Sequence, residues 1–384
     1  MLGQIVGGGN YILGNDDGRD KSGDSTNNTL SIVRSLGEAN VAQTLILKCD
    51  EDTCFVAESK YLKKSKVYRI CKIEECMSIL ERLKDEDWEQ YIICSFDEAA
   101  VFIDKKEPVL SPFFRTPARG KQIGKLFNKD EQCKLAEKCG LTVPKSIKFH
   151  RTENIDNVDF DYPVLLKPLN STQGEKGDIH ICRSKVEVEA ALAIESHCAD
   201  FILQEFIDKE YEIDCIGVRT DKEMYVAGGV RKIRHYPRLI GAGAYGQFRP
   251  MEDFDIDVDC VEKFLEQANY YGPFSVEFLH RDNKNYFMEV NFRNEGLAYV
   301  ATAAGANLHA LYLKPDMKIE KNKVHRIYMM NYSLDFLYVK NGELSLWSWI
   351  RDLLRTRCFI NINLKDLNPT VCYYKNKIKQ KLHL

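Results

Sequence analysis

The sequence predicts an α/β half followed by an α+β half, and two observations carry this prediction. Strand-like and helix-like segments alternate over the first hundred residues, which favours a parallel sheet with helices on its faces. From Tyr162 onward, apolar runs instead follow one another in pairs, as neighbouring strands of an antiparallel sheet do. A chain of 384 residues is long enough for more than one domain.

The first half contains one well-marked helix between short apolar strands. Residues 25–36 (STNNTLSIVRSL) are expected to form a capped helix that ends at Gly37. The glycines at 7–9 do not complete a GxGxxG motif, so they indicate a dinucleotide site only weakly. The other expected elements are strands at 11–14, 41–47 and 91–95 and a helix at 76–83.

A linker is expected between the halves at 105–120, because this segment holds three prolines and several basic residues. The segment 128–139 (NKDEQCKLAEKC) is expected to be a helix ended by Gly140. The later elements are expected to be strands at 163–168, 177–183, 201–207, 211–218 and 224–230, helices at 187–196 and 258–271, and a hairpin of 274–280 with 286–292.

Composition excludes several classes of protein. The net charge is −3, which favours neither nucleic acid nor an anionic membrane, and apolar (44%) and charged (29%) contents are those of a globular protein. No apolar run is long enough to span a bilayer, and the N-terminus lacks the pattern of a signal peptide. The thirteen cysteines form no CxxC pair, so we expect reduced, mostly buried thiols and a cytoplasmic protein.

The hairpin sequence YFMEVNFRNEG carries Glu289, Asn291 and Arg293 at every second position, with Met288, Val290 and Phe292 between them. If the turn centres on residue 283, Glu277 lies opposite Glu289, and directly opposed Cβ atoms are about 4.5–5.5 Å apart. Two such carboxylates repel each other unless a cation lies between them.

Magnesium fits this pair, because it takes oxygen ligands from one or two carboxylates and from substrate phosphates. Asn291 would add a neutral oxygen, and Arg293 would meet phosphate oxygens. The alternative is an exposed sheet face with ordinary mixed charges.

Upstream segments suggest an anion site. Lys167 ends the apolar strand DYPVLLKP, where it either extends to water or faces an anion. The loop 170–178 (NSTQGEKGD) could place backbone amides around phosphates, although a plain hairpin turn would look the same. Lys129 alone would be a solvated surface lysine.

The segment LQEFIDKEYEID has the features of a hinge between two lobes. Backbone groups freed where the apolar strand ends, at Glu205–Ile207, can pair with an adenine edge. A carboxylate just beyond could accept ribose hydroxyls, whereas without that context Glu210 and Glu212 are merely exposed strand acids.

Taken in order, these motifs resemble the ATP-grasp superfamily over residues 116–312, and most specifically in Glu-x-Asn-x-Arg with a glutamate on the partner strand. The N-terminal segments LSIVRSLGEANV and AESKYLKKSKVYRI are similar to carboxylate–amine ligases near D-aspartate ligase and the carbamoyl-phosphate synthetase large chain.

The resemblance implies a Rossmann-like pre-ATP-grasp domain at 1–115. A small ATP-grasp lobe with the phosphate loop (116–200), a large lobe with the hinge and metal hairpin (201–315) and a C-terminal extension (316–384) would follow.

The resemblance also implies residue roles and a reaction. The residues implied to bind ATP are Lys129, Lys167, Glu205, Ile207 and Glu210. The residues implied to bind Mg²⁺ or Mn²⁺ are Glu277, Glu289 and Asn291. The residues implied to be catalytic are Arg293 and Lys167. The expected reaction joins a carboxylate to an amine through an acyl phosphate. Kinase- or carboxylase-like chemistry, or nucleotide binding without turnover, remain alternatives.

The carboxylate-bearing substrate would suit an arginine fork, for which Arg231, Arg234 and Arg238 are candidates, although each is equally a surface cation. Relatives of this kind are often homodimers. The lysine-rich C-terminal tail could touch an anionic surface, but a solvated tail is the simpler interpretation.

Overall fold

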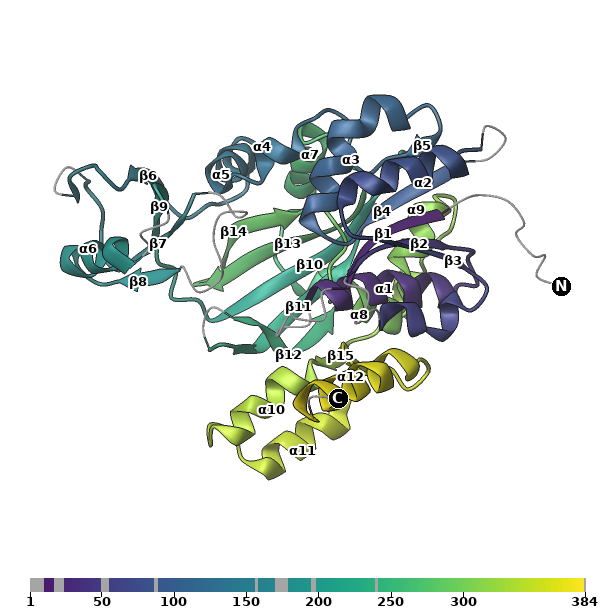
Figure 1. Cartoon of the computed structure of the whole chain (residues 1–384). Coiled ribbons are helices and arrows are strands. Elements are labelled where there is room, and N and C mark those ends of the chain that lie inside the picture. Colours follow the sequence, from purple (N-terminus) through teal and green to yellow (C-terminus); the bar gives the residue numbers. More distant parts are fainter. Residues whose placement is uncertain are drawn as a thin grey trace.

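The computed structural model describes residues 10–16, 24–49, 55–85, 89–155, 158–169, 179–194, 198–238 and 241–382, and these form three sheets with flanking helices (Figure 1). Short 3₁₀ helices punctuate the connections at η1 (Val56–Glu58), η2 (Lys60–Leu62), η3 (Ile73–Glu75), η6 (Met251–Asp253) and η7 (Lys321–Lys323).

The first sheet is parallel and five-stranded in the order β3–β2–β1–β4–β5, which confirms the predicted α/β half. Its strands are β1 (Asn10–Asp16), β2 (Thr44–Cys49), β3 (Lys66–Ile70), β4 (Gln90–Cys94) and β5 (Phe114–Arg115). Helix α1 (Asp24–Glu38) packs on one face, and α2 (Cys76–Leu83) and α3 (Asp97–Leu110) pack on the other. All five residues of β4 are buried, as expected for a sheet covered on both faces.

Two sequence-based boundaries are wrong in this half. Helix α1 continues through Gly37, where a Cβ would lie 2.3 Å from the ring of Tyr61, so the glycine serves close packing and does not end the helix. The expected linker begins as helix, because α3 runs to Leu110 with Pro108 inside it. The buried side chains of α3, including Ile103, outweigh the one helical hydrogen bond that the proline removes.

The second sheet is antiparallel and four-stranded in the order β6–β9–β7–β8. Its strands are β6 (Ser146–His150), β7 (Val164–Pro168), β8 (His180–Cys182) and β9 (Asp200–Glu205), covered by α6 (Lys185–Ile194). It has its own hydrophobic core around Phe149, Leu166 and Phe201, and it stands apart at the left of Figure 1. Helices α4 (Ile123–Leu126) and α5 (Lys129–Lys138) lead into it; α5 was expected from the sequence, and Asn128 caps its N-terminus.

The third sheet has seven strands in the order β14–β13–β10–β11–β12–β15–β16, all antiparallel except the β15–β16 pair. The strands are β10 (Tyr211–Arg219), β11 (Met224–Tyr236), β12 (Ala242–Arg249), β13 (Gly272–Arg281), β14 (Lys284–Asn291), β15 (Ile327–Met330) and β16 (Thr356–Phe359). Helices α7 (Val258–Gln267), α8 (Ala298–Ala303) and α9 (Leu308–Leu313) complete this part of the chain.

The C-terminal segment adds α10 (Tyr332–Lys340), α11 (Leu346–Arg355) and α12 (Asn368–Leu382), seen at the bottom of Figure 1. The buried Arg34 of α1 ties this segment to the first sheet, because its Nε donates to Asp366 Oδ2 at 3.2 Å and its Nη1 donates to the Ile360 carbonyl. The extension is therefore packed onto the molecule up to at least Asp366.

The β13–β14 hairpin turns at Asp282 and Asn283, both with positive φ (49° and 57°), as expected for a type I′ turn. The pairing of Arg281 with Lys284 would on its own put Glu277 out of register with Glu289. A β-bulge between Glu277 and Phe278 restores the predicted pairing of Glu277 with Glu289 and of Ser275 with Asn291.

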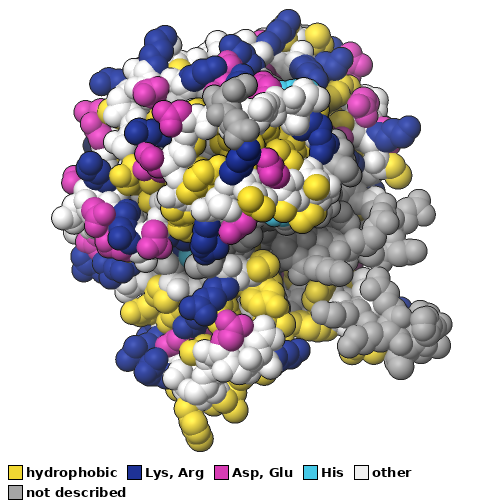
Figure 2. All heavy atoms as spheres, turned by 90° about the vertical axis from the view of Figure 1, so that its left-hand side faces the viewer, with side chains coloured by type: hydrophobic (Ala, Val, Ile, Leu, Met, Phe, Trp, Pro, Cys, Tyr) yellow, Lys and Arg dark blue, Asp and Glu magenta, His cyan; other side chains and the backbone are white. Residues whose placement is uncertain are grey.

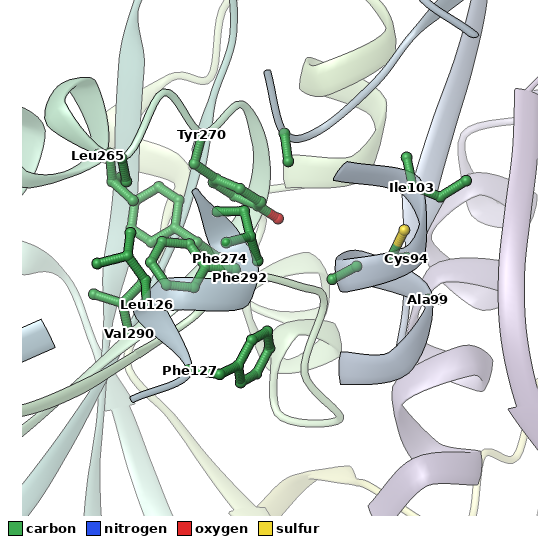
Figure 3. Close-up of a cluster of buried hydrophobic side chains, with 14 of the residues drawn as sticks. Cys94, Ala99, Ile103, Leu126, Phe127, Leu265, Tyr270, Phe274, Val290 and Phe292 are labelled. Carbon is green, nitrogen blue, oxygen red and sulfur yellow. The ribbon is translucent and has the colours of Figure 1, made fainter. Parts of the chain in front are cut away.

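The bulge also corrects the expected position of Met288, which lines a pocket, while Phe287 takes its place in the core. Farther along, Val290 and Phe292 keep their expected side. They pack with Phe274 and Tyr270 against Cys94 of β4 and the buried face of α3 (Figure 3). The hairpin is thus fixed to the first sheet through its apolar face.

Two expectations about the whole chain can be compared with the structure. No helix in the described ranges is both long enough and apolar enough to cross a membrane. Eleven cysteines of the described ranges carry free thiols, but Cys49 is disulfide-bonded, so the expectation of reduced thiols is wrong at that position. Acidic and basic side chains alternate over the face shown in Figure 2, in keeping with the small net charge.

Candidate active site

A pocket of about 240 Å³ lies between the four-stranded and seven-stranded sheets. Its lining comes from β7 and the start of α5, from the β13–β14 hairpin, and from the connection between β9 and β10. Among the residues that line it are Lys129, Lys167, Ile207, Glu277 and Glu289, five of those singled out from the sequence. The fold therefore brings together cations and carboxylates that lie 160 residues apart in the chain (129 to 289).

Glu277 and Glu289 are paired across adjacent strands, and both line this pocket. The amide nitrogen of Asn291 donates to Ser275 Oγ at 3.1 Å and lies 3.5 Å from Glu277 Oε1. Two facing carboxylates with an amide beside them make a set of hard oxygen donors. Such a set fits a magnesium or manganese ion that also contacts phosphate.

Lys167 is 4% exposed, and its Nζ donates to Gln204 Oε1 at 2.8 Å. Burial, and then the nearby charge of Lys129, lower the pKa of Lys167 to about 8. A buried ammonium with a depressed pKa gains from a negative charge placed beside it. Lys129 and Lys167 therefore give the pocket a cationic, phosphate-compatible part of its lining.

Lys232, which the sequence analysis missed, lies at the centre of the polar face. Its Nζ is 3.2 Å from Glu277 Oε2, 3.3 Å from Glu212 Oε2 and 3.7 Å from Asp214 Oδ2. Burial alone would lower the pKa of Lys232, but these carboxylates, Glu277 first, raise it well above its ordinary value. The sequence carried no distinct signal for it, because Lys232 stands between Arg231 and Ile233 in a basic stretch of β11.

The connection between the lobes differs in detail from the expected hinge. Ile207 lines the pocket, but Glu205 does not: its N–H donates to the Lys145 carbonyl at 2.8 Å, and its Oε2 accepts from Lys145 N. Glu210 is exposed outside the pocket and accepts from the N–H of Asp282 in the hairpin turn at 3.3 Å.

The acid that lines the pocket near this connection is Glu212. Its Oε2 lies 2.9 Å from His235 Nε2, and it also contacts Lys209. Burial alone would raise the pKa of Glu212, but Lys232 and His235 together hold it well below its usual range. Glu212 is therefore ionised and able to accept hydroxyl hydrogen bonds.

Arg293 lies on the same side of the hairpin, where its Nε donates to Asp97 Oδ1 at 2.6 Å. Burial alone would lower the pKa of Arg293, but Asp97 and then Glu295 raise it. Asp97 begins α3, so the first domain holds the guanidinium at the end of the polar face.

The three arginines proposed for a substrate carboxylate have other contacts, and none lines the pocket. Arg234 makes a forked pair with Asp335 (2.7 and 2.9 Å) and also bonds Asp352, which ties β11 to α10 and α11. Arg231 stacks on Tyr211, its guanidinium carbon 4.0 Å from the ring centroid. Arg238 borders a separate groove beside β8 and α6. The loop 170–178 lies outside the described residues.

Comparison with known proteins agrees with this geometry. Residues 134–303 match the model of the ATP-grasp domain. A segment of 149 residues is 30% identical to N5-carboxyaminoimidazole ribonucleotide synthase of Aquifex aeolicus, covering 37% of this chain and 38% of that protein. The match thus spans well under half of the curated relative.

Solved structures resemble a larger part of the chain. The L-amino acid ligase of Bacillus licheniformis is 14% identical with a TM-score of 0.58, over 84% of this chain and 75% of that one. The biotin carboxylase domain dimer of the Hydrogenobacter thermophilus 2-oxoglutarate carboxylase, solved with MgADP and bicarbonate, is 14% identical with a TM-score of 0.60, over 83% and 73%. The chain contains an ATP-grasp domain and has the fold of ATP-grasp enzymes, as its motifs predicted.

Proposed function

We propose that the protein is an ATP-dependent carboxylate–amine ligase that forms an amide or peptide-like bond through an acyl phosphate. The observation that carries this proposal is that the paired Glu277 and Glu289 line one pocket together with Lys129 and Lys167. Its ATP-grasp domain, and the ligase among its structural relatives, support the same class of reaction.

ATP would lie along the pocket from the connection between the lobes to the hairpin. Adenine would pack near Ile207, where Leu279 and Met288 add apolar surface. Glu212 takes the ribose role in this proposal in place of Glu210, because it lines the pocket and is held ionised. Lys129 and Lys167 would contact the phosphates.

Glu277, Glu289 and Asn291 would hold Mg²⁺ or Mn²⁺, which neutralises phosphate charge when bound. Arg293, fixed by Asp97, would stabilise the phosphoryl group as it moves to the substrate carboxylate. The acyl phosphate and ADP form in this step. An amine then attacks the acyl carbon, and phosphate leaves as the amide bond forms.

The ion pairs of Arg234 and the position of Arg231 on Tyr211 give these two arginines structural roles. We propose small-molecule substrates, a cytoplasmic location where ATP is available, and a homodimer by analogy with the dimeric carboxylase domain. We also propose the division of the chain into four parts at 115, 200 and 315. Strand β9, which begins at the boundary at 200, pairs with β6 and β7 in the four-stranded sheet.

The second candidate is a carboxylase-like reaction in which bicarbonate takes the place of the organic carboxylate. The structural relative solved with MgADP and bicarbonate favours keeping it. A nucleotide-binding module without turnover is disfavoured, since Glu277, Glu289, Asn291 and Arg293 are all present on one side of the hairpin.

The test is ADP release with Mg²⁺ and ATP across amino acids paired with amines, and separately with bicarbonate. A ligase produces ADP only when both an organic carboxylate and an amine are present, and a matching amide appears by mass spectrometry. ADP that depends on bicarbonate would establish the second candidate. ATP binding with no ADP under any of these conditions would contradict both.

A further inference from the structure

The polar face holds a group of three carboxylates that come from β10, β13 and the segment after β14. Asp214 of β10 is paired with Glu277 of β13 in the sheet register, and Glu295 follows β14. One ligand oxygen from each lies within 4.8 Å of the others. We call Asp214, Glu277 and Glu295 the carboxylate triad.

Asp214 is the unusual member of the triad. It is fully buried at 0% exposure, and neither of its carboxylate oxygens accepts a hydrogen bond from any donor in the described part of the chain. By contrast, Glu295 Oε2 accepts from Ser275 Oγ at 2.6 Å. A buried carboxylate without donors is costly, since removal from water is not compensated by hydrogen bonds.

The cations nearby do not balance the triad. Lys232 approaches Asp214 only to 3.7 Å and lies closer to Glu277 and Glu212, so one ammonium is shared among several acids. Arg293 interacts electrostatically with Glu295, but its Nε is bonded to Asp97. Burial, and then the charge of the neighbouring carboxylates, raise the pKa of both Asp214 and Glu295, so these acids lack the cationic partners that would keep them ionised.

We propose that the carboxylate triad binds a hard divalent cation, distinct from the ion expected between Glu277 and Glu289 and independent of nucleotide. Three carboxylate oxygens within 4.8 Å supply the donors that Mg²⁺, Mn²⁺ or Ca²⁺ prefer. Glu277 belongs to both sets, so the two ions would share this side chain. The second ion also compensates the oxygens of Asp214, which accept no hydrogen bond in the described part of the chain.

The test titrates Mn²⁺ into chelator-treated, nucleotide-free full-length protein, with free Mn²⁺ followed by electron paramagnetic resonance. The wild type binds Mn²⁺, and Asp214→Asn weakens the affinity at least tenfold. Glu289→Gln is the matched control, because it removes a carboxylate from the nucleotide pair only, and it retains the wild-type affinity within about threefold.

Thermal unfolding with and without Mn²⁺ provides a second measurement. Mn²⁺ raises the Tm of the wild type and of Glu289→Gln but not of Asp214→Asn, since a ligand stabilises only the protein that binds it. If Asp214→Asn does not fold, Glu295→Gln takes its place.

Unchanged Mn²⁺ affinity in the triad variants would overturn the proposal. Binding lost in Glu289→Gln but kept in Asp214→Asn, or no Mn²⁺ binding without nucleotide, would also overturn it. No turnover is measured, so failure here is separate from failure of the proposed ligase activity.

Discussion

The β13–β14 hairpin has one apolar, buried face and one polar face that borders the pocket. On one face Val290 and Phe292 are 3% and 0% exposed and pack against the first domain (Figure 3). On the other, Glu289 lines the pocket and Arg293 bonds the first residue of α3. Alternate residues of one strand thus serve packing and chemistry separately, so substitutions on the two faces should have separable effects.

The largest effect is expected on the polar face. Glu289→Gln removes one charge from the facing pair, so the metal and its phosphates lose a ligand. We expect ADP formation to fall about a thousandfold, equivalent to about 4 kcal/mol, with no loss of thermal stability because a repulsion is relieved. Steady-state ADP assays and thermal melts measure the two quantities. If Glu289→Gln turned over ATP at the wild-type rate, Glu289 would have no role in the site.

Substitutions on the apolar face should lower stability and leave nucleotide binding unchanged. Phe292→Ala empties a buried ring site, and such deletions cost about 3–5 kcal/mol of the free energy of unfolding. Urea denaturation measures this loss. At a temperature where the variant remains folded, we expect its KM for ATP to stay close to the wild-type value. A large rise in KM without a stability loss would show that the two faces are not separable.

The pKa of Lys167 gives a pH-dependent test of the contact proposed between this lysine and the phosphates of ATP. With a pKa of about 8, this lysine loses its proton as pH rises through that value, so ATP affinity should fall by up to about tenfold per pH unit above it. Lys167→Arg should remove this pH dependence, because a guanidinium stays charged. Calorimetric titration of ATP between about pH 7 and about pH 9 measures the effect.

The same pKa affects stability in the other direction. Between about 8 and the ordinary value of 10.5, the unfolded state binds more protons at this lysine than the folded state does. The contribution of Lys167 to the free energy of unfolding therefore increases as pH rises through this window.

A wild-type ATP affinity that stays constant to about pH 9 would contradict a phosphate role for Lys167.

The smallest effect is expected at the turn that joins the two faces. Asn283 has φ of 57° in a type I′ turn, a conformation that glycine adopts without a Cβ penalty. Asn283→Gly should change the free energy of unfolding by only a few tenths of a kcal/mol and leave ADP formation unchanged. Asp282, the other turn residue, donates its N–H to Glu210, so its backbone position is less free to change.

Local patterns predicted much of this fold. The helix near 128–139, the polar residues at every second position of the hairpin and the order of strands and helices each depend on neighbouring residues, and each was found. Long-range packing caused the failures. Neither the continuation of α1 past Gly37 nor that of α3 past Pro108 could be inferred from residues near them in sequence.

The candidate site shows the same division. Symmetric spacing about residue 283 predicted that Glu277 lies opposite Glu289. In the structure the β-bulge between Glu277 and Phe278 produces this register. Lys232 and Asp214 were missed, because their environment comes from carboxylates on neighbouring strands that single-strand patterns do not reveal. Glu210 and Glu212 could be distinguished only from the structure, in which Glu210 precedes β10 and Glu212 lies within it.

Anomalous scattering from crystals grown with Mn²⁺ and a non-hydrolysable ATP analogue tests the central claim most directly. The account predicts a manganese peak coordinated by both Glu277 and Glu289 and by oxygens of the nucleotide phosphates. A nucleotide-bound manganese that neither carboxylate touches, or a nucleotide bound elsewhere in the molecule, would contradict it.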